Sequence, residues 1–185
     1  MIFLEVLICI LIADLLSGFF HWLEDSYGQE DWLIIGDLVT IPNILHHHHP
    51  RHFVNASWWL RNRVLLFLGV KTLLISHLFH FFNWQILLVI LVGTSANEIH
   101  RWAHQTPQEN GRAIHFLQNF GVLQSPLHHA FHHQGQKNTH YCVITNWVNP
   151  IVDAMNLWLF LETLIAKLLG IYRRSDQYIC QSEVQ

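Results

Sequence analysis

Charged side chains are scarce in this sequence: Asp, Glu, Lys and Arg together make up 12% of the 185 residues, which is about half the usual share. Hydrophobic residues make up 51%, so the composition is closer to that of a membrane protein than to that of a soluble enzyme. The formal net charge is only -3, and the sequence has no basic tail. These features argue against a nucleic-acid-binding protein.

Cysteine is also rare. Cys9, Cys142 and Cys180 are an odd number without a paired spacing, which argues against a disulfide scaffold and indicates reduced thiols and an active portion that faces the cytosol. Residues 1–22 lack the positive start and the small-residue cleavage site of a signal peptide, so they favour a retained membrane anchor.

The chain length allows one domain with a core of its own. We expect this domain to comprise residues 1–172, followed by a polar tail at residues 173–185.

Long apolar segments determine the expected fold. Residues 2–22 are sufficient to cross a hydrocarbon layer of about 30 Å as a helix. Residues 64–82 and 84–99 form an apolar pair joined at Asn83, and an amphipathic run from Pro150 to residue 169 is either a fourth crossing or an interfacial helix. The sequence thus predicts an all-α integral membrane bundle of three to four apolar helices with a histidine-rich cap.

Shorter elements connect these segments. Residues 32–41 are expected to be interfacial or re-entrant, residues 46–52 to be a loop, and residues 113–123 to be a short amphipathic helix after a stop at Pro107. Asn149 is expected to cap the helix that starts at Pro150.

The expected topology places the histidine-rich segments on one side of the membrane. The positive-inside rule makes that side cytoplasmic, because it also carries a group of arginines. These are Arg51, Arg61, Arg63 and Arg101.

Histidine is abundant, with 16 residues, and four of them lie close together in residues 126–146. At about 100° per residue, His128, His129, His132 and His133 share one half of a helix surface. Neutral imidazole is the commonest protein ligand for transition metals. This cluster, with His140 close behind it, predicts a metal site.

Other histidines are expected to join this site from separate segments. His100 and His104 are four residues apart, and His21 ends the first apolar segment. The run of four histidines that starts at His46 has an open register, so His48 or His49 could replace His46 or His47. The full set of candidate ligands is His21, His46, His47, His100, His104, His128, His129, His132, His133 and His140.

Three further histidines are excluded as ligands. His77 and His80 lie near the turn at Asn83, on the side opposite the cluster, and His115 is unaccompanied.

Ten candidate ligands are too many for one zinc ion, which takes at most four in a structural site. Two ions fit better, and an imidazole shell favours non-haem iron or a similar redox metal over magnesium or calcium. The ligand count does not identify the metal. Asp14, inside the first apolar segment, is expected to orient a histidine ligand, since ionisable groups at membrane depth are costly. Further candidates for additional ligands or orienting side chains are His52, Asp25 and Asp153.

Five blocks of this sequence resemble the lipid desaturase family, the histidine-rich membrane desaturases that include the plasmanylethanolamine desaturases. They occur in family order over residues 12–165. The blocks are residues 13–25 (Ala-Asp-Leu-Leu-Ser-Gly-Phe-Phe-His-Trp-Leu-Glu-Asp), His46-His47 before Pro50, Arg51-His52-Phe53, residues 97–104 (Asn-Glu-Ile-His-Arg-Trp-Ala-His), and residues 128–133 with Thr139-His140-Tyr141-Cys142.

The resemblance implies a multi-pass membrane enzyme that holds two iron ions and uses O2 to insert a double bond into a chain of a membrane lipid. It also implies an electron donor such as cytochrome b5 or ferredoxin, and no nucleic-acid partner. The sequence departs from the family pattern where Pro50 directly precedes Arg51 and where the Asp of Arg-His-Asp-Phe is missing. The lipid class is therefore not carried over.

Three other functions are open from the residues. A lipid hydroxylase could use the same di-metal scaffold, a membrane protein could bind or transport metal without catalysis, and a membrane hydrolase could use two zinc ions. Transport predicts ionisable residues along a path through the membrane, whereas these histidines gather on one side.

Overall fold

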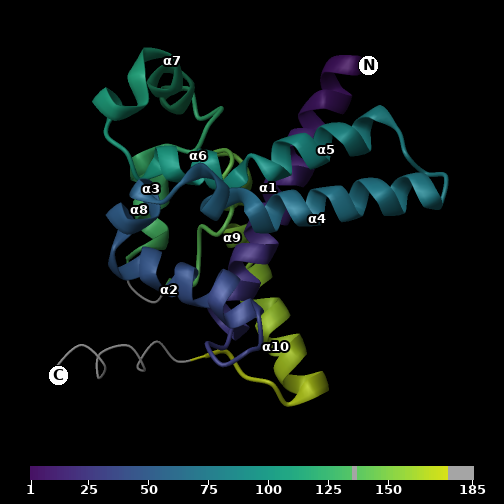
Figure 1. Ribbon diagram of the computed structural model, residues 1–185, viewed down its shortest axis with the longest axis vertical. Coiled ribbons are helices and arrows are strands. Elements are labelled where there is room, and N and C mark those ends of the chain that lie inside the picture. The colour runs from purple at the N-terminus through teal and green to yellow at the C-terminus, as the bar shows by residue number, and fades with distance from the viewer. Residues whose placement is uncertain (135–136, 175–185) are drawn as a thin grey trace.

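The computed structural model describes residues 1–134 and 137–174, and its described residues form helices and connecting segments without a β-strand (Figure 1). The all-α prediction is therefore confirmed for this part of the chain. Most of the tail expected at residues 173–185 lies outside it. The helices are α1 (Ile2–Tyr27), the π-helix η1 (Gly36–Thr40), α2 (Ile41–His48), α3 (Pro50–Asn55), α4 (Trp58–Leu78), α5 (Trp84–Thr94), α6 (Ala96–Ala103), α7 (Pro107–Asn119), α8 (Pro126–His132), α9 (Val148–Ala154) and α10 (Leu157–Leu169).

Among the described helices, α1 is the one that is both long and apolar enough to cross a membrane. It runs five residues beyond the expected end at Trp22, and this extension carries Asp25. α4 has 21 residues but contains Arg61, Arg63 and Lys71, and α5 has only 11 residues. One such helix does not establish a bundle of several crossings.

Helices α4 and α5 form the expected hairpin, which lies against α1 and points away from α2, α3 and α8 (Figure 1). The two helices approach closely at Gly69, where a Cβ atom would lie 2.6 Å from the Thr94 side chain. Asn83 caps α5 by accepting a hydrogen bond from the Ile86 N–H. His77 and His80 lie at this end of the hairpin, far along the chain from the other histidines.

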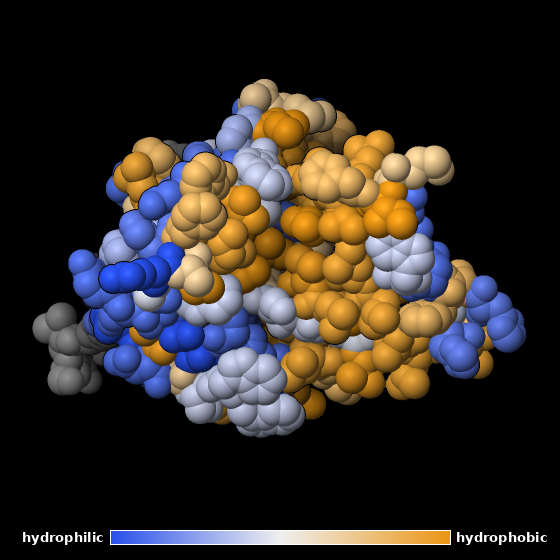
Figure 2. Space-filling model, turned by 90° about the horizontal axis from the view of Figure 1, so that it is seen from above, coloured by the Kyte–Doolittle hydropathy of each residue, from blue (hydrophilic) through white to orange (hydrophobic). Residues whose placement is uncertain are grey.

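Apolar side chains cover most of the right half of the face shown in Figure 2, and hydrophilic residues gather mainly on its left. Large exposed hydrophobic residues occur on the helices that diverge from the histidine-rich end. They include Phe3, Phe67, Leu91 and Leu168. Such an extended exposed apolar surface is typical of a membrane or interaction surface.

The histidine run is helical, so the loop expected at residues 46–52 is corrected. Helix α2 continues to His48, His49 leaves the helical region with φ -131°, and α3 begins at Pro50. Proline suits the first turn of a helix because its missing N–H needs no partner there. The expected segment 32–41 divides into a turn, with Ile34 at positive φ, and the π-helix η1.

Two helix starts are also corrected. Pro107 begins α7 as well as following the end of α6, because Thr106 and Glu109 form a capping box. The helix is kinked at Gly111, where φ is 73°, so the helix expected at residues 113–123 corresponds to the part after the kink, which ends at Asn119. The helix expected from Pro150 to residue 169 is two helices, separated where Asn156 adopts φ 52°. Asn149 lies inside α9 and does not cap it.

An irregular segment at residues 139–147 passes through the centre of the fold. Tyr141 packs with Trp22 and Trp158 in one buried cluster, and Ile144 packs with Ile99 in another. This segment therefore joins the helices that carry the histidines.

Candidate metal centre

The structure gathers nine side chains into two neighbouring groups whose potential metal-binding atoms lie within 4.8 Å of one another in each group. The first ligand group is His46, His100, His104, His129 and His133. The second ligand group is His21, Asp25, His47 and His132.

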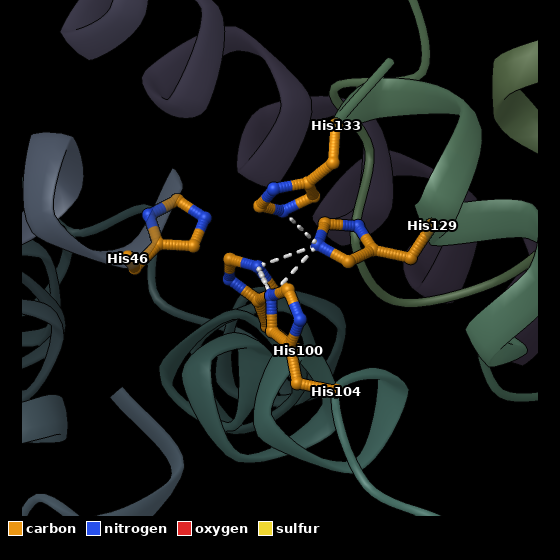
Figure 3. A group of neighbouring side chains, drawn as sticks. All are labelled: His46, His100, His104, His129 and His133. Atoms are coloured by element: carbon orange, nitrogen blue, oxygen red, sulfur yellow. Dashed lines mark hydrogen bonds between the residues drawn. The ribbon is translucent and has the colours of Figure 1, made fainter. Parts of the chain in front are cut away.

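Four Nε2 atoms of the first ligand group converge on one point (Figure 3). The Nε2 atom of His129 lies 2.9 Å from that of His100, 3.0 Å from that of His104 and 3.0 Å from that of His133. The Nε2 atoms of His100 and His104 are 3.1 Å apart. Metal–imidazole bonds of about 2.1 Å would place neighbouring ligand atoms about 3.0 Å apart in an octahedron and about 3.4 Å apart in a tetrahedron. Nε2 atoms at these separations would be able to bind one ion together.

Hydrogen bonds among these imidazoles cannot account for their approach. The Nε2 atoms of His100, His104 and His129 form a closed triangle of contacts. Each Nε2 atom is either a donor or an acceptor, so at least one side of the triangle pairs two atoms of the same kind. A cation that accepts all three lone pairs removes this conflict, and the donor set therefore fits a metal ion.

Burial keeps these imidazoles in the neutral form that binds metal. Burial and the neighbouring histidines hold the pKa values of His46, His100 and His129 well below the usual value. The same two effects lower the pKa of His104 to about 3 and that of His133 to about 2. All five rings are therefore neutral at pH 7.

Asp25 is at the centre of the second ligand group. Its Oδ1 atom lies 3.0 Å from His47 Nε2, and its Oδ2 atom lies 3.2 Å from His132 Nε2 and 3.8 Å from His21 Nε2. His21 and Asp25 are four residues apart on α1, so they share a helix face. The Nε2 atoms of His21 and His132 and the Oδ2 atom of Asp25 are buried without a hydrogen-bond partner. Such atoms are costly unless a partner is bound.

Three ligand rings are oriented by backbone carbonyl groups. The Nδ1 atoms of His21, His46 and His132 lie 3.1, 2.7 and 2.8 Å from the carbonyl oxygens of Tyr141, Asn43 and Thr139, respectively. An Nδ1–H that donates to a carbonyl leaves the Nε2 lone pair facing the site.

The two ligand groups are adjacent. His46 and His47 follow each other on α2 but enter different groups, and His132 and His133 do the same at the end of α8. The His21 and His100 rings, one from each group, have centroids 5.5 Å apart. Two ions bound here would occupy one continuous cluster.

His128 and His140 enter neither group. Their ring centroids lie 5.0 Å apart in a separate pair. Asn149 lies 3.1 Å from His128 Nε2, and Asp153 lies 3.2 Å from His140 Nδ1. Asp153 therefore contacts this pair and not a member of the two ligand groups.

Asp14, the residue expected to orient a histidine ligand, has a different set of partners. Its carboxylate accepts hydrogen bonds from the backbone N–H groups of Ile144 and Thr145 and from the Thr145 hydroxyl. His52 is exposed, as are His48 and His49, so the geometry favours His46 and His47 as the register of the histidine run.

Asn43 contributes to the site in a way that the sequence did not reveal. Its side chain donates to Asp25 Oδ1 over 2.5 Å, and its carbonyl accepts from His46. It precedes His46 by three residues and His47 by four. If the histidine run is assigned to a helix and not to a loop, this spacing places Asn43 on the same helix face as His46 and His47, which is the sequence signal that could have identified it.

Comparisons with known proteins identify relatives of this chain. A family model described as the lipid desaturase domain matches residues 10–176. A probable fatty acid desaturase of Acanthamoeba polyphaga mimivirus is 29% identical over 95% of this chain and 88% of its own length. Plasmanylethanolamine desaturase 1 of Mus musculus is 30% identical over 95% of this chain and 69% of its own length. Fatty acid desaturase 4-like 2 of Arabidopsis thaliana is 30% identical over 89% of this chain, which covers only 60% of that protein. No solved structure gives a significant match.

Proposed function

The chain belongs to the lipid desaturase family, and from this premise we propose that it is a membrane-bound di-iron enzyme that introduces a double bond into an acyl or alkyl chain of a lipid. The observation that carries the proposal is the pair of adjacent ligand groups, with eight imidazoles and one carboxylate between them. The imidazole-rich donor set favours a redox metal over magnesium or calcium.

The reaction balances as the loss of two hydrogens from neighbouring carbons, with O2, two electrons and two protons giving two molecules of water. The bound metal supplies the oxidising chemistry. The protein supplies the neutral imidazoles and keeps the cluster buried, and backbone carbonyls orient three of the rings. A donor such as cytochrome b5 or ferredoxin is proposed as the source of the electrons.

The membrane arrangement that we propose has α1 and the α4–α5 hairpin in the bilayer and the ligand groups on its cytoplasmic side. Three observations support it: the apolar length of α1, the large apolar area on the face shown in Figure 2, and arginines at the histidine-bearing end of the hairpin. These arginines are Arg61 and Arg101, which both pair with Glu98.

An apolar groove beside α6 is the proposed place for the lipid chain. Its volume of about 500 Å³ falls in the range of small-molecule sites, about 300–1,000 Å³. Its lining includes Ile99, which directly precedes His100 of the first ligand group. The lining residues are Phe3, Val6, Leu7, Ile10, Leu91, Val92, Ser95, Ile99, Val122, Leu123, Ile144 and Trp147.

The groove leads to a prediction about chain length. Val122→Trp is expected to shift the preferred substrate toward shorter chains, because the larger ring fills part of the groove. The measurement is the product profile on lipids that differ only in chain length. Leu74→Trp, at an exposed position of α4 outside the groove, is the matched control and should leave the profile unchanged. An unchanged profile in Val122→Trp would place the lipid chain elsewhere.

The central test combines metal analysis with lipid analysis. Protein produced with added iron and purified in detergent is expected to contain about two iron ions per chain. Cells that express it are expected to gain a lipid with one additional double bond, relative to cells without the gene. Zinc alone in an active preparation would favour the hydrolase, and a hydroxylated lipid product would favour a hydroxylase on the same scaffold.

A further inference from the structure

Two histidines of the second ligand group depend on one irregular stretch of backbone. The Thr139 carbonyl lies 2.8 Å from His132 Nδ1, and the Tyr141 carbonyl lies 3.1 Å from His21 Nδ1. We call residues 139–145 the carbonyl segment. It is not helical, so no regular hydrogen-bond ladder fixes the direction of these carbonyls. Its buried backbone groups must find partners elsewhere.

Helix α1 supplies one set of partners. Asp14 accepts from the backbone N–H groups of Ile144 at 2.8 Å and Thr145 at 3.0 Å, and from the Thr145 hydroxyl at 2.6 Å. Ser17 Oγ accepts from the Val143 N–H at 3.2 Å.

These side chains lie on the same stripe of α1 as His21. Asp14 precedes His21 by seven residues and Ser17 precedes it by four, so at about 100° per residue all three lie within an arc of about 60°. The helix that presents the His21 ring therefore also holds the segment that orients it.

Helix α9 holds the carbonyl segment from its other side. Asn149 accepts from the Cys142 N–H at 2.9 Å and donates to the Cys142 carbonyl at 2.8 Å. Asp153, one turn later on α9, accepts from the His140 N–H at 3.1 Å. Both anchoring points flank Tyr141, whose carbonyl faces His21.

Glycine at position 18 permits the close approach of the segment to α1. A Cβ atom there would lie 2.5 Å from Cys142 Sγ and 3.0 Å from the Cys142 backbone nitrogen. The backbone contact cannot be relieved by a side-chain rotation, so a larger residue would displace the segment.

We propose that Asp14 and Asn149 are positioning residues for the metal centre. They act through the carbonyl segment, by fixing the carbonyls that set the tautomer and direction of His21 and His132. The inference rests on the proposed metal centre, because positioning has a function only if these rings bind an ion. It also explains why an acidic side chain is buried in α1 without contact to a histidine.

The test uses Co²⁺ as a probe with metal-free protein in detergent. Asp14→Asn keeps the shape of the side chain but replaces one acceptor oxygen by a donor. Asn149→Leu removes both hydrogen bonds to the Cys142 backbone, together with the contact to His128. Each is expected to weaken Co²⁺ binding at the second ligand group by about 10–100-fold, which is the usual effect of losing a side chain that orients a metal ligand. Co²⁺ binding at the first ligand group should be unchanged. The visible absorption of the bound Co²⁺ should change in position or intensity.

Two controls separate positioning from general stability. Ser17→Ala removes a milder contact to the segment, and it keeps the test usable if Asp14→Asn does not fold. Ser76→Ala removes a serine on α4 that is more deeply buried than Ser17 and whose hydroxyl donates to the Leu73 carbonyl of its own helix. Ser17→Ala should weaken Co²⁺ binding at the second ligand group alone. Ser76→Ala should leave the affinity of both ligand groups for Co²⁺ unchanged, even if it lowers the melting temperature.

The outcomes are distinct. Variants that melt earlier but bind two Co²⁺ ions with parental affinity and spectrum would overturn the inference and leave a purely structural role. A parent protein that binds no second ion would instead overturn the proposed two-metal centre, and the inference with it.

Discussion

Replacing His129 with alanine is expected to abolish desaturation and to remove the ion of the first ligand group. His129 is the hub of that group, because its Nε2 atom lies within 3.0 Å of those of His100, His104 and His133. His129 is 1% exposed, so it lies in the interior of the cluster. Product formation should fall to the background of cells without the gene, and elemental analysis should find about one ion per chain in place of two.

His77→Ala is the matched control for this variant. His77 is an exposed histidine at the far end of the α4–α5 hairpin and belongs to neither ligand group. Its removal should change neither the metal content nor the product. Full activity in His129→Ala would show that the first ligand group is not the catalytic metal site.

Local periodicity was sufficient to find most of the candidate ligands. His100 and His104, and the cluster around His129, lie at helical spacings that bring imidazoles to one face whatever surrounds the helix. Eight of the ten histidines proposed as ligands enter the two groups. His128 and His140 do not. His128 is at the edge of the predicted half-surface, where a small rotation of α8 turns its ring toward Asn149.

The division of the ligands into two groups was not available from the sequence. His46 and His47 are adjacent, yet one enters each group, because neighbouring side chains on a helix point about 100° apart. This assignment requires that residues 46 and 47 be helical and that α2 present His46 to His100 of α6 and His47 to Asp25 of α1. The sequence had suggested a loop there, and a loop predicts no direction for either ring.

Asp14 illustrates a second limit. Its position in an apolar segment, at helical spacing from His21, predicted that it orients a histidine ligand, but the partners of its carboxylate are Ile144 and Thr145. Hydrogen bonds to an irregular segment far along the chain leave no periodic trace in sequence. The count of membrane crossings is limited in a similar way: apolar runs predict candidates, whereas in the described chain only α1 meets the criteria of length and apolarity.

Replacing Asp25 with asparagine is expected to remove the ion of the second ligand group while the first is retained. Asp25 is the only anionic side chain in either group, and its two oxygens contact His47 and His132. An amide has no charge to balance a cation, and its NH2 would face a histidine nitrogen or Asn43, which already donates to Asp25. Desaturation should fall to background even though about one ion per chain remains, since the proposed reaction requires both ions.

The matched control for this variant is Asp37→Asn, at an exposed aspartate of η1 outside both groups, which should retain two ions and full activity. Two ions and full activity in Asp25→Asn would instead mean that imidazoles alone bind the metal and that Asp25 only orients them.

Together, the His129 and Asp25 variants test whether the two ligand groups bind their ions independently. If each retains one ion and neither has activity, the two ions act as a unit. If either variant loses both ions, the shared neighbours His46–His47 and His132–His133 couple the groups, and the cluster forms only when it is complete.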